Sequence, residues 1–204
     1  MIHQVAQRDN FLRFDLKNTS GITLSPFGDM RRKENRRYIQ DILNTDRIYL
    51  GRQIHSANIR IVEGKEEEVF FDDTDGLITF KRGIALGVLV ADCFPVLFEG
   101  EDFVAILHCG YKGIRNGIIE KFFKLLKEMK VEYKNISSLI GPGICGKHYW
   151  IDLKRIILGK LELEGVKNII DSGVCTFEDK RFFSYRREGE NTGRNLAVIL
   201  FDSS

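Results

Sequence analysis

The sequence contains Val96-Leu-Phe-Glu99-Gly-Glu-Asp102-Phe-Val-Ala-Ile-Leu107, in which two apolar runs flank a Gly-Glu pair. A pair that begins with glycine between two such runs is typical of a two-residue β-hairpin turn. This register pairs Glu99 with Asp102 and, further along the strands, Cys93 with His108. The hairpin would therefore place a thiol and an imidazole on neighbouring strands, within reach of each other or of a shared metal ion.

Two features leave this register open. Pro95 cannot donate a hydrogen bond within a central ladder. A slip of one residue would also point the side chains of Cys93 and His108 to opposite faces of the sheet.

The rest of the chain predicts strands and helices without a strict β-α-β alternation. Helical spacing of apolar side chains predicts a helix over 113–130, and we expect further helices over 30–44 and 151–163. Segment 195–201 is apolar enough for either helix or strand, and 18–21 is expected to be a turn. Expected strands cover 2–6, 11–16, 47–50, 58–62, 77–80, 84–90, 95–98, 103–108, 136–140, 169–171 and 182–185. This mixture predicts an α+β fold with mixed sheets.

Composition excludes several classes of protein. The 204 residues include 43% hydrophobic and 29% charged side chains and carry a net charge of +2, which is typical of a globular domain, here expected over 1–204. The even charge balance argues against a dedicated nucleic-acid-binding protein. The longest apolar stretch, 84–90, is too short to cross a bilayer. The N-terminus does not resemble a signal peptide, so we expect a cytoplasmic protein with no membrane partner.

The cysteines and histidines are the candidates for chemistry. The 4 cysteines form no CxxC pair and are not a disulfide framework. His55 follows an expected strand and could join Cys93 and His108. Two imidazoles and a thiolate would leave a fourth position open for water, which is the form of a catalytic zinc site. Because these residues are far apart in the chain, a core cysteine and two surface histidines remain the alternative.

Short motifs follow one another in order from about residue 34 to the C-terminus. They are Gln53-Ile-His55-Ser, Asp75-Gly-Leu-Ile-Thr79, Ala91-Asp92-Cys93-Phe-Pro95-Val-Leu97, His108-Cys109-Gly110-Tyr111-Lys112-Gly113, Ile140-Gly-Pro142, Phe183-Ser-Tyr-Arg186-Arg187 and Thr192-Gly-Arg194. Each motif alone is weak, whereas the ordered set is specific. Together they resemble the family described as YfiH-like, DUF152 or multicopper polyphenol oxidase (laccase-domain) proteins.

The resemblance implies a fold, a metal and an activity. The implied fold is the layered α+β arrangement shared with the CNF1-like group, and the implied metal, usually zinc with copper possible, would be bound by His55, Cys93 and His108. The implied activity is phosphorolysis of adenosine, inosine, guanosine and methylthioadenosine, with possible adenosine deamination. We accordingly expect a small-molecule substrate (a purine nucleoside and phosphate), no nucleic-acid partner, and a monomer or homodimer.

Further residues are candidates for roles around that metal. Cys93 and His108 would lie at the reacting centre, and Asp92 is the nearest candidate acid or base, although it could instead be a structural carboxylate that caps the turn before Pro95. Phosphate needs cations, and an arginine fork suits its oxygens. The candidates for substrate binding are Gln53, Lys112, Arg115 and Arg194, with Arg186 and Arg187 as further cationic options.

The sequence departs from the family pattern around the substrate. Tyr111-Lys112 stands where the family has Trp-Arg, Gly143 replaces a cysteine, and Ile157 and Lys160 replace an Asn and a Gln. An N-terminal motif of the family has no clear equivalent in 8–29. The three expected metal ligands are intact, but the preferred nucleoside, the general acid or base and activity itself stay open.

Three alternatives follow from the same residues. Cys93 and His108 could form the thiolate–imidazole pair of a cysteine hydrolase. A structural zinc would need a fourth ligand, for which Cys109, Cys145 and His148 are candidates. Copper-dependent polyphenol oxidation is disfavoured, because 4 histidines are too few for a multicopper cluster.

Overall fold

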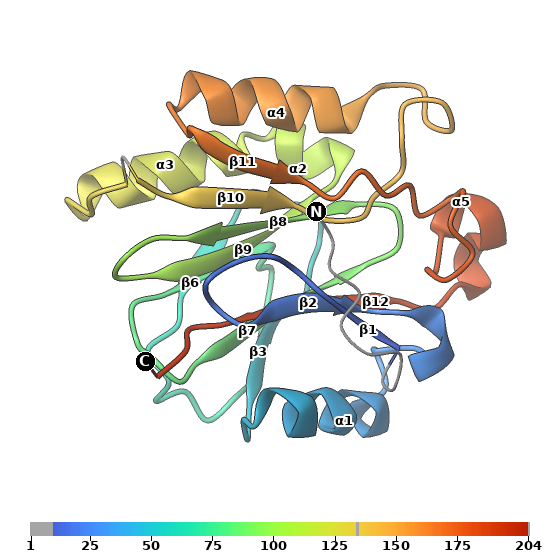
Figure 1. Cartoon of the computed structure of the whole chain (residues 1–204), viewed down its shortest axis with the longest axis horizontal. Coiled ribbons are helices and arrows are strands. Elements are labelled where there is room, and N and C mark those ends of the chain that lie inside the picture. Colours follow the sequence, from blue (N-terminus) through green and yellow to red (C-terminus); the bar gives the residue numbers. More distant parts are fainter. Residues whose placement is uncertain (1–9, 134, 204) are drawn as a thin grey trace.

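The computed structural model describes residues 10–133 and 135–203 and contains two mixed six-stranded sheets (Figure 1). The first sheet has the order β1-β2-β12-β7-β3-β5, with β1 (Phe11–Arg13), β2 (Ser20–Thr23), β12 (Asn195–Leu200), β7 (Ala85–Val90), β3 (Ile48–Gly51) and β5 (Phe70–Phe71). The second has the order β11-β10-β8-β9-β6-β4, with β11 (Asn168–Asp171), β10 (Ser137–Ile140), β8 (Phe94–Glu99), β9 (Val104–Cys109), β6 (Gly76–Thr79) and β4 (Ile59–Ile61). The predicted α+β fold with mixed sheets is confirmed.

Three apolar cores hold four layers together. Helix α1 (Lys33–Leu43) packs on the first sheet through Ile39 and Leu43. Side chains such as Leu86 and Ile106 fill the space between the two sheets. Phe98 and its neighbours pack against α3 (Ile118–Glu128) and α4 (Leu153–Leu163), which cover the outer face of the second sheet (Figure 1). Within the described residues, no helix combines the length and the apolar character that a membrane span requires.

The hairpin forms, but the predicted register is wrong by two residues. Glu99 pairs with Val104 rather than with Asp102, and His108 pairs with Pro95 rather than with Cys93. The physical reason is a longer loop over 100–103, in which the Gly100 N–H donates to the Phe103 carbonyl across 2.9 Å. Because side chains alternate with a period of two, a shift of two residues preserves the face to which each side chain points.

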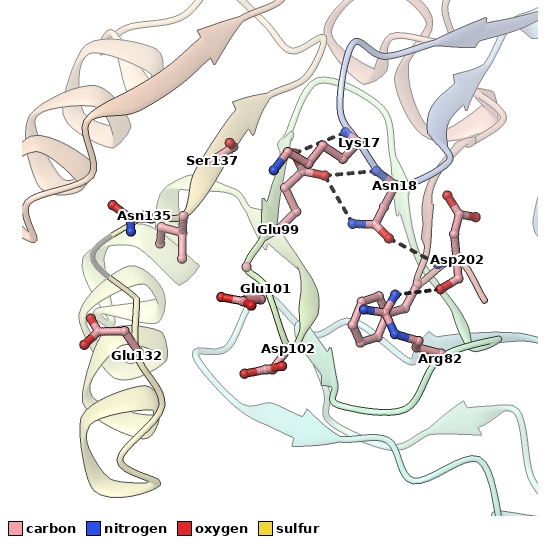
Figure 2. A pocket seen from close by; sticks show the side chains of 13 residues that line it. Lys17, Asn18, Arg82, Glu99, Glu101, Asp102, Glu132, Asn135, Ser137 and Asp202 are labelled. Atoms are coloured by element: carbon pink, nitrogen blue, oxygen red, sulfur yellow. Dashed lines mark hydrogen bonds between the residues drawn. The ribbon is translucent and has the colours of Figure 1, made fainter. Parts of the chain in front are cut away.

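The far end of this hairpin anchors the N-terminal segment. The Glu99 carboxylate accepts hydrogen bonds from the backbone N–H groups of Lys17 and Asn18 at 3.2 and 3.0 Å, and the Asp202 N–H donates to the Asn18 side chain (Figure 2). These residues line a cavity of about 530 Å³ whose walls contain none of the candidate site residues. The Glu99 carboxylate in this cavity therefore has a structural role, because it holds the N-terminal segment in place.

The predicted helix over 113–130 is two helices. Helix α2 (Tyr111–Arg115) ends before Gly117, which has a φ of 80°, and α3 begins at Ile118. A left-handed residue cannot continue a right-handed helix, and glycine adopts this conformation without steric cost. The break lets α2 follow β9 directly while α3 lies along the sheet.

Some local predictions were wrong elsewhere in the chain, and one open choice is resolved. Segment 18–21 is not only a turn, because β2 begins at Ser20. Strand β5 was not predicted. Segment 182–185 is not a strand: Ser184 caps α5 (Tyr185–Glu188) by accepting a hydrogen bond from the Arg187 N–H. Segment 195–201 is strand β12, central in its sheet. The strand predicted over 2–6 lies outside the described residues.

Candidate active site

The three candidate metal ligands come together from three different elements. His55 lies in the loop after β3, Cys93 in the turn between β7 and β8, and His108 in β9. One ligand atom of each lies within 4.8 Å of the others. His55 Nε2 is 3.8 Å from Cys93 Sγ, and the two imidazole rings meet edge to face with centroids 4.8 Å apart. The hairpin register was wrong, yet the predicted neighbourhood of Cys93 and His108 is present because the face was preserved.

Asp75 organises this site from behind. Its carboxylate is buried and accepts hydrogen bonds from the backbone N–H groups of Ile54, His55 and Ser56 at 3.1, 3.0 and 2.8 Å. The Ser56 hydroxyl and His108 Nδ1 also bind it, each at 2.8 Å. One carboxylate therefore fixes both the loop that carries His55 and the ring of His108. Sequence reasoning treated Asp75 as part of a turn and a motif, and did not assign it to the site.

The contact with Asp75 determines which nitrogen of His108 is free. Because Asp75 holds Nδ1, Nε2 is the nitrogen of His108 left for Cys93 or for a metal ion. Burial raises the pKa of Asp75, but hydrogen bonds from His108 and Ser56 outweigh burial and lower the pKa to about 2. The carboxylate is therefore charged at neutral pH.

Cys93 and His108 perturb each other's ionisation. Burial raises the pKa of Cys93, but the adjacent His108 and His55 outweigh it and lower the pKa to about 6. Burial lowers the pKa of His108, whereas the Cys93 thiolate and Asp75 raise it to about 9. A thiolate is available at neutral pH, as both a metal ligand and a nucleophile require.

The donor set fits a metal ion. Two imidazole nitrogens and a thiolate are ligands that zinc prefers, and three protein ligands leave a position for substrate or water. Close approach here depends on Gly110, where a Cβ atom would lie 2.8 Å from Cys93 Sγ and 3.0 Å from His55 Cδ2. Glycine at position 110 therefore leaves Cys93 and His55 room to move when an ion binds.

Backbone conformation at the site is strained at two non-glycine residues. His55 has a φ of 62° and Asp92 a φ of 87°. Such residues persist only where the surroundings fix them, and they cluster at functional sites. Both Asp92 oxygens are engaged, Oδ1 by the Thr176 hydroxyl at 2.7 Å and Oδ2 by the Arg186 N–H at 2.6 Å. These contacts are structural but differ from the predicted cap of the turn before Pro95, because they tie the carboxylate to Thr176 and to the start of α5.

The site opens into a cavity of about 940 Å³. Of the candidate substrate residues, Gln53, Lys112 and Arg194 line it. The Gln53 amide pairs at both ends with the Leu89 backbone, at 2.9 and 2.8 Å, so it links the His55 loop to β7. Arg115 lies on α2 and is not among the lining residues.

Sequence reasoning missed most of the cavity wall. Arg31, Arg52, Phe70, Tyr111, Tyr149, Tyr185 and Arg186 line it. Arg186 was a cationic option, and its motif was the available signal; the others come from loops, β5, α2 and α5, which only the fold brings together. Arg187 is not among the lining residues; its guanidinium donates to the carbonyls of Thr176, Phe177 and Phe182.

Gly110→Ala is expected to weaken metal binding at least about tenfold without unfolding the protein, because the new methyl group would displace Cys93 and His55. Crowding of this kind costs about 1–3 kcal/mol of unfolding free energy, and displaced ligands lose affinity. Metal retained after dialysis and urea unfolding measure the two effects.

The matched control is Gly159→Ala, since a Cβ atom on Gly159 in α4 meets nothing within 4 Å. It is expected to gain about 0.5–1 kcal/mol of unfolding free energy, as glycine-to-alanine changes do inside helices. Unchanged metal affinity in Gly110→Ala would contradict the crowding argument.

A family model described as "Multi-copper polyphenol oxidoreductase laccase" matches residues 28–152 and 146–202. A purine nucleoside phosphorylase of Corynebacterium glutamicum is 33% identical over 196 residues, covering 81% of this chain and 79% of the relative. A purine nucleoside phosphorylase of Campylobacter jejuni is 32% identical over 171 residues, covering 72% and 74%.

Solved structures agree with the fold. YlmD from Geobacillus stearothermophilus superposes with a TM-score of 0.90 at 24% identity, covering 99% of both chains. The hypothetical protein YfiH from Bacillus licheniformis superposes with a TM-score of 0.87 at 23% identity, covering 96% of this chain and 98% of that one. These two likenesses establish the layered fold.

Proposed function

The chain belongs to the multi-copper polyphenol oxidoreductase laccase family, the YfiH-like family, and on that premise we propose that it is a metal-dependent purine nucleoside phosphorylase. The observation that carries the proposal is the placement of His55, Cys93 and His108 in one cavity lined by both cations and aromatic rings. Its similarity to relatives named purine nucleoside phosphorylase supports the choice of substrate.

Phosphate would bind where two guanidinium groups converge. Arg31 Nη2 and Arg194 Nη1 both donate to the Thr192 carbonyl, at 2.9 and 3.1 Å. Burial lowers the pKa of Arg194, and the charge of Arg31 lowers it further. Asp29, which pairs with Arg31 at 2.7 Å, offsets part of their repulsion, and an anion beside both groups would offset more. Arginine presents a planar fork to phosphate oxygens.

The purine would lie among the aromatic side chains. Tyr111, Tyr149 and Tyr185 reach the cavity from α2, from the loop before α4 and from α5. Arg186 lies over the Tyr149 ring at 5.2 Å, which gives that ring a fixed orientation. Stacking on such rings suits any purine base, so it supports a broad nucleoside range.

The metal would be held by His55, Cys93 and His108, and when bound it would supply a Lewis acid that stabilises negative charge in the transition state. In phosphorolysis, a phosphate oxygen forms a bond to C1′ of the ribose as the bond to the purine nitrogen breaks. The base leaves with a proton, and ribose 1-phosphate remains. Adenosine deamination in the same cavity would instead add water at C6 and release ammonia.

The test is an assay of purified protein with measured metal content on adenosine, inosine, guanosine and methylthioadenosine, with and without phosphate. We expect free base only with phosphate, together with ribose 1-phosphate from the first three substrates and 5-methylthioribose 1-phosphate from methylthioadenosine. Deamination would appear as phosphate-independent formation of inosine from adenosine. Metal-loaded protein that releases no base from any of the four nucleosides would overturn the proposal.

Arg194→Ala is expected to raise the KM for phosphate about ten- to hundred-fold, because a charged hydrogen-bond donor contributes about 1.5–3 kcal/mol. The effect on the KM for the nucleoside should be smaller, since the guanidinium is assigned to phosphate. Steady-state kinetics with each substrate varied in turn separate the two. Arg37→Ala, on the exposed face of α1, is the control; equal effects in both variants would remove Arg194 from the phosphate site.

A cysteine hydrolase is the second candidate, because the paired ionisation of Cys93 and His108 is what a nucleophilic thiolate needs. It requires no metal and no role for His55. Activity in metal-free protein, abolished by alkylation of Cys93, would favour it. Copper-dependent phenol oxidation has less support: among the described residues, His55 and His108 are the histidines of this site, and His148 belongs to another group.

The other residues considered as a fourth ligand of a structural zinc, Cys109, Cys145 and His148, do not belong to this group of three. Cys109 is fully buried in the core beneath α2, and Cys145 lies with His148 in that other group. All 4 cysteines are free thiols, which fits the proposed cytoplasmic location.

A further inference from the structure

A second group of ligand-type side chains lies outside the active-site cavity. Cys145 and His148 belong to the loop 141–152 between β10 and α4, and Glu178 belongs to the loop 172–184 between β11 and α5. One ligand atom of each lies within 4.8 Å of the others. None of the three lines the cavity, so the group is separate from His55, Cys93 and His108.

The separations suit a tetrahedral ion. His148 Nε2 is 2.9 Å from Glu178 Oε1, and Cys145 Sγ is 4.0 Å from the same oxygen. Zinc bonds of about 2.0–2.3 Å place ligand atoms about 3.3–3.6 Å apart. The two observed values straddle that range, and both involve Oε1 of the exposed Glu178 side chain, whose rotation can lengthen one and shorten the other. We propose that Cys145, His148 and Glu178 bind a second divalent cation of the zinc class.

The ligands are positioned by contacts that do not depend on an ion. Gly143 and Cys175 form a parallel bridge between the two loops, and the Thr176 N–H donates to the Gly143 carbonyl at 3.1 Å. The His148 ring stacks on Phe177 with centroids 4.3 Å apart and planes 26° apart. A stacked imidazole with a fixed backbone loses little freedom on binding, which favours affinity.

Cys175 supports the thiol ligand from the buried side. Its Sγ accepts a hydrogen bond from the Cys145 N–H at 3.3 Å. It is not part of the three-residue group, so the fourth position is left to water.

The position of this group gives the ion a structural role. Ile144 and Tyr149, the chain neighbours of Cys145 and His148, line the active-site cavity. Thr176, in the facing loop, binds the Asp92 carboxylate at 2.7 Å. An ion that joins the two loops would therefore fix one wall of the substrate cavity from outside.

Metal stoichiometry tests the proposal independently of nucleoside turnover. The full-length protein, stripped by a chelator and reloaded with Zn²⁺, is expected to hold two ions per chain. His148→Ala and Cys145→Ser should each hold one, as should His55→Ala, and the double variant His55→Ala/His148→Ala should hold none. Glu162→Gln, an exposed glutamate on α4, is the control and should hold two.

Cobalt spectroscopy identifies the ligand. In Cys93→Ser the active-site thiolate is absent, so a thiolate-to-cobalt charge-transfer band in that variant must come from another cysteine. We expect this band with Co²⁺, and expect its loss in Cys93→Ser/Cys145→Ser. We also expect the affinity of the second ion to fall about a hundredfold or more in Glu178→Gln.

Three results would overturn the inference. One is a wild-type protein that holds a single ion lost in His55→Ala. Another is a second ion that persists in both His148→Ala and Cys145→Ser. The third is a chain found two hydrogens lighter under native conditions with a Cys145–Cys175 disulfide. Each can occur whether or not the protein is a phosphorylase, so the two proposals fail separately.

Discussion

His108→Ala is expected to lower kcat/KM for nucleoside phosphorolysis by about 10³-fold or more, because a bound metal contributes several kcal/mol to the transition state and His108 is one of its three proposed ligands. Its side chain is buried between Asp75 and Cys93. Removing the ring therefore takes away a ligand and one of the donors that hold the buried Asp75 carboxylate. Steady-state kinetics and metal analysis on the same preparation measure the loss.

The companion variant His55→Ala separates the two candidate chemistries. The metal hypothesis predicts that it loses metal and activity to a similar degree as His108→Ala. The dyad hypothesis predicts that His55→Ala keeps most of its activity, since a Cys93–His108 pair does not need it. Thermal unfolding of both variants checks that the fold is retained, and a folded His108→Ala protein with wild-type turnover would place the chemistry elsewhere.

The face of the hairpin could be predicted from the sequence, whereas its exact register could not. Alternating apolar residues determine which side of a strand is buried, and this information survived a two-residue error at Pro95 and His108. Loop length depends on backbone hydrogen bonds such as that from Gly100 to Phe103, which composition does not reveal. The prediction that Cys93 and His108 lie close together was therefore right because the predicted face was right, although the predicted residue pairing was wrong.

Features that depend on a single backbone conformation were hidden from sequence patterns. The apolar periodicity of 113–130 continues across Gly117, and only its positive φ separates α2 from α3. Segment 182–185 has the aromatic residues that strands favour, but tertiary contacts override that preference and Ser184 caps a helix instead. Arg194 was predicted, but its neighbour Arg31 was missed for a related reason: the two are distant in sequence and meet only through Thr192.

Asp75 shows why part of the site lay beyond prediction. It stands in Asp72-Asp-Thr-Asp-Gly76, whose composition is a turn signal, and three of its hydrogen bonds go to backbone N–H groups of a distant loop. A backbone N–H does not depend on which side chain its residue has, so a pattern of side chains does not predict these hydrogen bonds. The carboxylate is nevertheless the group that positions two of the three proposed ligands.

Asp75→Asn is expected to weaken metal binding and kcat/KM by about ten- to hundred-fold, the usual cost of losing a partner that orients a ligand. An amide has one acceptor oxygen, so its NH₂ group would face N–H or O–H donors that the carboxylate now accepts. Breaking a buried charged network also lowers the free energy of unfolding, here by about 2–4 kcal/mol. Isothermal titration with Zn²⁺ and urea unfolding of the metal-free protein measure the two terms.

Asp73→Asn is the matched control, because Asp73 lies in the same turn, is exposed and has a φ of 50°, which asparagine tolerates well. It should change neither quantity by more than about 0.5 kcal/mol, as is usual for surface substitutions. The decisive comparison is between Asp75→Asn and His55→Ala. If Asp75 acts by positioning, excess Zn²⁺ should restore much of the activity of Asp75→Asn, since all three ligands remain, but not that of His55→Ala. An Asp75→Asn protein whose activity cannot be restored by metal would instead give Asp75 a direct part in the reaction.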